Sequence, residues 1–208
     1  MDTLTLDLGR EARLASGFEI RRADSDSPLV EFVGYASVTG VQYDVAGGPD
    51  MGGWTEVMAP GAFKRTLGRE QNRALLFHHD GSRVLATTRA GSLSMIEDEI
   101  GLLTRAQLDT RVSWIADLVT QIESGTIDEM SIGFYALGSE WSKDYNERTI
   151  TEVRLVEATI TWAGANGATV AGIERSRDLV NEVRSAHTVR SLNRVAIAAQ
   201  AAAALASR

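Results

Sequence analysis

The hydrophobic positions of this chain fall mostly into short runs with the period of a β-strand. These runs are rich in β-branched and aromatic residues and are bounded by turn-forming residues, a pattern typical of strands. The pattern predicts strands over residues 29–38, 74–79, 92–96, 101–108, 130–137 and 149–162. The polar connection 142–147 has the composition of a hairpin turn, so it should join the last two strands directly.

Helical spacing is clearest in one segment between these strands. Its apolar residues recur with the period of an amphipathic helix that packs on a sheet: Trp114, Ile115, Leu118, Val119 and Ile122. Asp109 or Thr110 is expected to cap its start, and Gly125 to supply the left-handed residue at its end. A second, short helix is expected over residues 60–67, where Pro60 precedes it.

Many strands with one or two helices predict an α+β fold, namely a small, mainly antiparallel, closed or partly closed β-barrel flanked by helices. Composition divides the chain into three parts. Residues 1–28 form a polar N-terminal segment, residues 29–173 the main domain, and residues 174–208 a charged, then alanine-rich, helical tail. Alanine favours helix but buries little area, so we expect the tail to be a loosely attached or removable extension.

Composition and charge narrow the classes of function. With 21 basic and 28 acidic residues the net charge is -7, which argues against a nucleic-acid surface. The chain has no cysteine, which excludes disulfides, thiolate metal sites and a cysteine nucleophile and is compatible with a reducing cytoplasm. No apolar run approaches the roughly 20 residues that span a bilayer, and Asp2 and Asp7 do not suit an export signal. We expect no membrane or nucleic-acid partner and no cofactor.

The three histidines are the candidate bases: His78, His79 and His187. If residues 74–80 are extended, His78 and His79 point to opposite faces, so one site can use one of them, and the pattern does not choose between the two. His78-His79-Asp80 also invites a metal interpretation, but neighbours on a strand diverge and thiolates are absent. His187 lies in the charged tail and is expected to have no specific role.

Ser131 is a candidate nucleophile on a predicted strand. Alternation places Met130, Ile132 and Phe134 toward the core and Ser131 toward the other, open face, where a serine is usually just solvated. Gly133 lies two residues further on the same face, and a glycine inside a strand often marks the close approach of a ligand or another backbone. A peptide substrate lying along the strand is one such backbone.

Glu157 interrupts an apolar strand and therefore lies at an edge or has a partner. The partner is either an arginine such as Arg154 or Arg105, in a salt bridge, or a histidine, whose tautomer the carboxylate would fix. The order histidine, serine, glutamate suggests a nucleophilic serine, because a serine hydroxyl needs an imidazole base and usually a carboxylate to orient it.

Several segments together resemble the prohead proteases of tailed phages, serine proteases of capsid maturation that look related to the herpesvirus assemblins. The segments are residues 32–38, 58–63 with 66–67, 75–80, 101–103 with 106–109, 130–134 and 155–159. The resemblance implies an assemblin-like fold and selects His79, the histidine directly before Asp80, as the catalytic base. It implies Ser131 as the nucleophile and Glu157 as the third member.

The resemblance also implies a biological setting. It predicts a serine endopeptidase that cuts scaffold or capsid-protein extensions, and itself, inside the prohead in the bacterial host cytoplasm. The major capsid protein and the scaffold are then its partners as substrates, and the enzyme forms a homodimer or higher oligomer. The alternatives are a non-catalytic head-assembly or scaffolding protein with the same fold, and a domain that binds peptide strands by edge addition.

Overall fold

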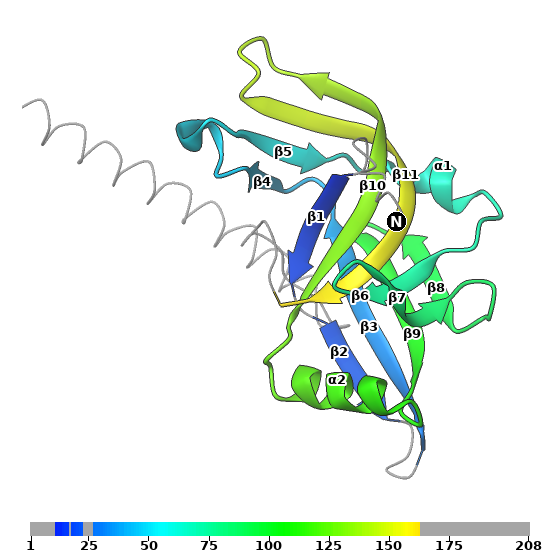
Figure 1. Cartoon of the computed structure of the whole chain (residues 1–208). Helices are drawn as coiled ribbons and strands as arrows, with labels where there is room; N and C mark the ends of the chain where they lie inside the picture. Colours follow the sequence, from blue (N-terminus) through cyan, green and yellow to red (C-terminus); the bar gives the residue numbers. More distant parts are fainter. Residues whose placement is uncertain (1–10, 17, 23–26, 163–208) are drawn as a thin grey trace, which may run out of the picture. The chain divides into compact units, whose positions relative to one another are not determined.

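The computed structural model describes residues 11–16, 18–22 and 27–162, which form two β-sheets with two α-helices (Figure 1). The seven-stranded sheet contains β1 (Glu11–Ser16), β4 (Gln42–Val45), β5 (Trp54–Met58), β6 (Ala74–Phe77), β7 (Asp80–Thr87), β10 (Glu129–Trp141) and β11 (Glu147–Thr161). The four-stranded sheet contains β2 (Phe18–Arg22), β3 (Leu29–Val38), β8 (Leu93–Glu97) and β9 (Gly101–Asp109). The helices are α1 (Lys64–Leu67) and α2 (Ser113–Glu123), and a 3-10 turn, η1, covers Pro49–Met51.

The long hairpin of β10 and β11 is the spine of the larger sheet, which runs in the order β1-β10-β11-β5-β4 (Figure 1). On the edge of β11 away from β10, two strands pair in parallel: β5 with the start of β11 and β6 with its end. The β6 strand then pairs antiparallel with β7. The end of β11 therefore lies between β6 and the start of β10, and all three segments are far apart in the sequence.

The smaller sheet is antiparallel throughout, in the order β2-β3-β9-β8. The N-terminal chain supplies an edge strand to each sheet, β1 to the larger and β2 to the smaller. One continuous core includes residues of both sheets and α2, and Leu67 of α1 packs against it; its largest fully buried side chains include Phe32, Phe63 and Phe134.

The observed strands correct the expected barrel. The predicted α+β content is confirmed, but the hydrogen-bonded strands among the described residues form two separate sheets, and no closed barrel is found there. The reason is that the outermost strands, β1 and β4 in the larger sheet and β2 and β8 in the smaller one, do not pair with each other among the described residues. The alternation of apolar residues also does not reveal the parallel pairing of β5 and β6 with β11. Residues 163–208, which include the predicted tail and His187, lie outside the described part, so the three-part division of the chain stays a prediction.

The short helix α1 begins later than residue 60. Glu97 of β8 accepts hydrogen bonds from the backbone N–H of Gly61, at 2.5 Å, and of Phe63, at 3.2 Å. Gly61 has a positive φ of 93°. The residues after Pro60 therefore form a turn that Glu97 holds, and Phe63 enters the core before the helix starts.

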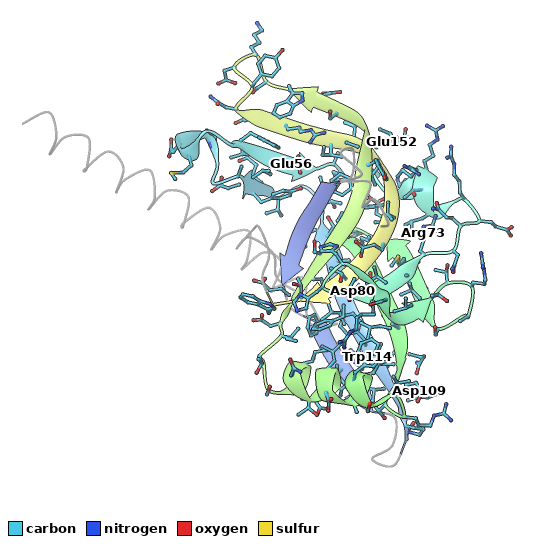
Figure 2. All side chains as sticks on the ribbon, viewed as in Figure 1. Glu56, Arg73, Asp80, Asp109, Trp114 and Glu152 are labelled. Carbon is cyan, nitrogen blue, oxygen red and sulfur yellow. The ribbon has the colours of Figure 1, made fainter. Side chains whose placement is uncertain are left out.

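A buried carboxylate ties the outer strands of the larger sheet to the hairpin. Glu56 of β5 is fully buried and is labelled in Figure 2. It accepts hydrogen bonds from the Tyr43 hydroxyl of β4, at 2.6 Å, and from Arg148 Nη1 of β11, at 3.2 Å. A buried charge is tolerated when it is paired and hydrogen-bonded in this way, so the network fixes how β4 and β5 join β11.

The helix α2 buries four of the five residues of the predicted stripe, since Ile115, Leu118, Val119 and Ile122 are all at most 8% exposed, and the half-buried Trp114 packs against the core. The predicted N-cap is wrong, because Val112 is the N-cap residue and no side chain caps it. Asp109 instead accepts hydrogen bonds from Arg111, and the Thr110 hydroxyl donates to the carbonyl of Pro28. The predicted end is confirmed: Gly125 follows the C-cap with a φ of 71°. Neither described helix is long and apolar enough to cross a membrane.

Substituting alanine for Gly125 should lower the free energy of unfolding by about 1 kcal/mol, because an L-residue is strained at positive φ. Nothing lies within 4 Å of a Cβ at Gly125, so the loss is a backbone effect and not a clash. Gly81 is the control, since its Cβ also meets nothing within 4 Å and its φ is not positive. Urea unfolding should show a lower midpoint for Gly125→Ala alone; equal shifts for both variants would contradict this account.

Candidate active site

His78 and His79 form the two-residue turn between β6 and β7. Phe77 and Asp80 are directly paired across this hairpin, and the two histidines have φ angles of 53° and 58°. Two consecutive positive φ angles are the signature of a type I′ turn, which usually selects asparagine and glycine. A non-glycine residue in this region costs on the order of 1–3 kcal/mol and persists where the surroundings enforce it. The expectation of an extended strand through residue 79 is therefore wrong, because β6 ends at Phe77.

The His79 ring lies between a hydroxyl and a carboxylate. Its Nδ1 is 2.6 Å from Glu157 Oε1, and its Nε2 is 3.0 Å from Ser131 Oγ. With the proton on Nδ1, the ring donates to the carboxylate and its bare Nε2 accepts from the hydroxyl. The structure therefore brings together the three side chains His79, Ser131 and Glu157, which the family resemblance had singled out.

Ser131 and Glu157 share one face of the β10–β11 hairpin. Ser131 is paired with Thr159, and Glu157 with Gly133, so the two functional side chains are diagonal neighbours across the strands. The β6 strand pairs with the same stretch of β11, from Glu157 to Ile160, and this register delivers the histidine turn to that face. Figure 2 labels Asp80, the residue directly after His79, near the end of β11.

The site is more enclosed than alternation predicted. Ser131 is 2% exposed and Glu157 3%, whereas the His79 side chain is 32% exposed. The expected open face for Ser131 is therefore wrong, because residues 130–134 of β10 are buried on both faces. Of the two arginines considered for Glu157, Arg105 lies 3.8 Å from Glu31 and Arg154 stacks over the ring of Tyr135.

Both edges of β10 are occupied beside the serine. On one side β11 pairs with it, and on the other β1 does, with Leu14 opposite Ser131 and Ala12 opposite Gly133. A peptide strand therefore cannot add next to Gly133 while β1 is in place. This arrangement speaks against a domain that binds peptides by edge addition at this strand.

Neighbouring polar groups have other roles. Asp80 accepts hydrogen bonds from the hydroxyl and the backbone N–H of Ser82, which hold the pKa of its carboxyl below its ordinary value. The His78 ring contacts a threonine, since its Nδ1 is 2.8 Å from Thr161 Oγ1. In the described part of the chain, no three acidic or histidine side chains are placed to hold a metal ion.

The sequence did not single out two threonines. The backbone N–H of His79 donates to Thr159 Oγ1 at 2.9 Å, and Thr161 contacts His78 as described. Both threonines follow Glu157 on β11 at intervals of two residues and so lie on the same face of the strand. Strand periodicity could therefore have predicted them as site residues once Glu157 was chosen.

Burial, with a smaller contribution from the neighbouring His79, lowers the pKa of His78 below its ordinary value of 6.5. As the pH falls, the His78 imidazole is therefore protonated at a higher pH in the unfolded chain than in the folded protein. The contribution of neutral His78 to the free energy of unfolding is present above the pKa of the unfolded state, and it is lost as the pH falls from that pKa toward the lower pKa of the folded state. We expect the urea midpoint of His78→Asn to fall less between about pH 7.5 and 5 than that of the unsubstituted protein. Parallel curves for the two proteins would contradict this.

Two comparisons with known proteins identify the family of the chain. The family model described as caudovirus prohead serine protease matches residues 16–183, a range that contains His79, Ser131 and Glu157. A relative named prohead protease, from Enterobacteria phage HK97, is 30% identical over 137 residues, which cover 62% of this chain and 60% of the relative. The chain thus spans about 60% of the length of that curated relative. No solved structure matches significantly. Because the family model covers most of its length, the chain belongs to the caudovirus prohead serine protease family.

Proposed function

We propose that this chain is a serine endopeptidase of phage head maturation, with Ser131 as the nucleophile, His79 as the general base and Glu157 as its orienting carboxylate. The observation that carries the proposal is the His79 ring, which contacts Ser131 Oγ through one nitrogen and Glu157 Oε1 through the other. Both distances lie within hydrogen-bond reach for proton transfer and for orientation of the base. Membership of a serine protease family supports the same reaction.

Acylation begins at the 3.0 Å contact between Ser131 Oγ and His79 Nε2. His79 Nε2 takes the hydroxyl proton while Oγ forms a bond to the carbonyl carbon of the substrate peptide. The tetrahedral intermediate then collapses, the C–N bond breaks, and His79 gives the proton to the leaving amine. The products are an acyl-Ser131 enzyme and the new amino terminus of the substrate.

Deacylation repeats these transfers with water. His79 removes a proton from water, the resulting hydroxide oxygen attacks the acyl carbon, and the proton returns to Ser131 Oγ as the carboxylic acid leaves. Backbone N–H groups are expected to stabilise the oxyanion, since losing one such donor typically costs about 100-fold or more in rate.

Glu157 acts through the imidazole. Its carboxylate accepts the Nδ1–H hydrogen bond, at 2.6 Å, and so keeps Nε2 free to act as a base. Because Glu157 is 3% exposed, water screens it weakly, and its charge stabilises the imidazolium that forms during both transfers. Ser131 is similarly buried, so a substrate carbonyl reaches Oγ only when the groups that cover it move.

The substrates we propose are scaffold or capsid-protein extensions and the enzyme itself, cut inside the assembling prohead. The family description and the name of the phage relative support this setting. The major capsid protein and the scaffold are then partners as substrates, and a homodimer or higher oligomer is the proposed assembly state. A distant relation to the herpesvirus assemblins stays part of the proposal; an experimental structure that superposes on an assemblin over the β3, β10 and β11 strands would test it.

Coexpression of the chain with the capsid and scaffold proteins of its own phage tests the proposed activity. We expect the unsubstituted protein to shorten these proteins and to be labelled by a fluorophosphonate, and Ser131→Ala to do neither, because the acyl acceptor is lost. Ser139→Ala, an exposed serine on the same strand, is the matched control and should behave like the unsubstituted protein.

Intact-mass spectrometry measures both the shortening of the capsid and scaffold proteins and the fluorophosphonate labelling of the chain. Processing by Ser131→Ala at the unsubstituted rate would contradict the assignment of the nucleophile. Absence of processing by every form of the chain would favour a non-catalytic head-assembly protein.

A further inference from the structure

We propose that Thr159 and Thr161 are positioning residues that hold the His78–His79 turn in the conformation that presents His79 to Ser131. This inference rests on the proposed function and concerns the same site. It assigns a role to two hydroxyls that both contact the turn.

Every second residue at the end of β11 contacts the histidine turn. Glu157, Thr159 and Thr161 lie on one face of the strand because strand side chains alternate with a period of two. Glu157 Oε1 meets His79 Nδ1 at 2.6 Å, Thr159 Oγ1 accepts the His79 backbone N–H at 2.9 Å, and Thr161 Oγ1 lies 2.8 Å from His78 Nδ1. The strand is thus a template with three successive contacts to a two-residue turn.

The turn needs such a template because neither of its residues is a glycine. Both histidines have positive φ angles, of 53° and 58°, which an isolated L-residue seldom adopts. The backbone N–H of His78 continues the β6–β11 ladder to the carbonyl of Ile160, at 3.0 Å, but this bond fixes only the first residue. The Thr159 hydroxyl is what fixes the backbone of the second residue, whose ring does the chemistry.

Thr159 is also tied to the nucleophile by strand register. It is the residue on β11 directly paired with Ser131 on β10, and it is fully buried. One side chain therefore sets the position of the His79 backbone relative to the strand that carries the serine. Without that hydroxyl the N–H of His79 loses its partner, and the turn can relax toward a less strained conformation that moves Nε2 away from Oγ.

Thr161 acts on the first residue of the turn through its ring. The His78 imidazole contacts both Thr161 Oγ1 and the ring of Phe77, with 4.1 Å between the two ring centroids. The side chain of His78 is thus held by two partners, while the ring of His79 is the one that meets Ser131. We expect Thr161 to matter less than Thr159, because it steadies the neighbour of the catalytic base and not the base itself.

The rate of fluorophosphonate labelling of Ser131, followed across pH in the full-length protein, tests the proposal. Thr159→Val keeps the shape but not the hydroxyl, and should slow the maximal labelling rate by about 10- to 100-fold, since a misplacement near 1 Å can cost about 100-fold. Thr159→Ser restores the hydroxyl and should label within about threefold of the unsubstituted rate, because it again accepts the His79 N–H. The labelling rate of Thr161→Val should lie between the rates of Thr159→Val and Thr159→Ser.

Thr104→Val is the matched control. Thr104 is fully buried like Thr159, it lies on β9 of the other sheet, and its hydroxyl has no hydrogen-bond partner among the described residues. Its substitution should leave the labelling rate unchanged. Urea unfolding of each variant shows whether slower labelling comes from a loss of folding or from a displacement of His79 relative to Ser131 in the folded protein.

A second readout does not depend on activity. In a Ser131→Ala background, proton NMR should show a low-field resonance from the short His79–Glu157 hydrogen bond, and adding Thr159→Val should shift or broaden it. Unchanged labelling across pH together with an unchanged resonance in Thr159→Val would overturn the positioning role. Labelling that survives Ser131→Ala would instead overturn the proposed function, so the two failures are distinguishable.

Discussion

The pairing of β11 with β10 on one edge and with β6 on the other is the constraint on which the rest of the site depends. The antiparallel pairing places Ser131 diagonally across from Glu157, and the parallel pairing brings the end of β6 to the same stretch of β11. His79 follows at the turn and reaches both side chains, although they lie 52 and 78 residues away from it in the sequence. The backbone register of three strands therefore sets the geometry of three side chains.

The site combines two features that oppose folding. A nearly buried carboxylate loses hydration, and two left-handed histidines strain the turn. Both are compensated at the same place, because Glu157 accepts a hydrogen bond from the His79 ring N–H and β11 supplies partners for the turn. Strained residues tend to cluster where a side chain must be held in one orientation, and here that residue is His79.

Alternation and helical periodicity predicted six of the eleven described strands, the α2 helix and its left-handed Gly125 end, but not β1, β2, β4, β5 and β7. The family resemblance singled out the three side chains that the structure brings together. They did not predict the histidine turn, because a histidine pair lacks the asparagine and glycine that mark a type I′ turn. They also missed the two parallel pairings of β11, since these depend on contacts distant in sequence and not on local pattern. The burial of Ser131 follows from those long-range contacts as well.

The central claim is that Glu157 works on Ser131 through His79, and a double-mutant cycle on the labelling rate tests it most directly. The rate constants of fluorophosphonate labelling are compared for the unsubstituted protein, Glu157→Gln, His79→Ala and the double variant. If the residues act as a unit, Glu157→Gln slows labelling when His79 is present and has no further effect once His79 is alanine. The same factor of slowing in both backgrounds would contradict the account.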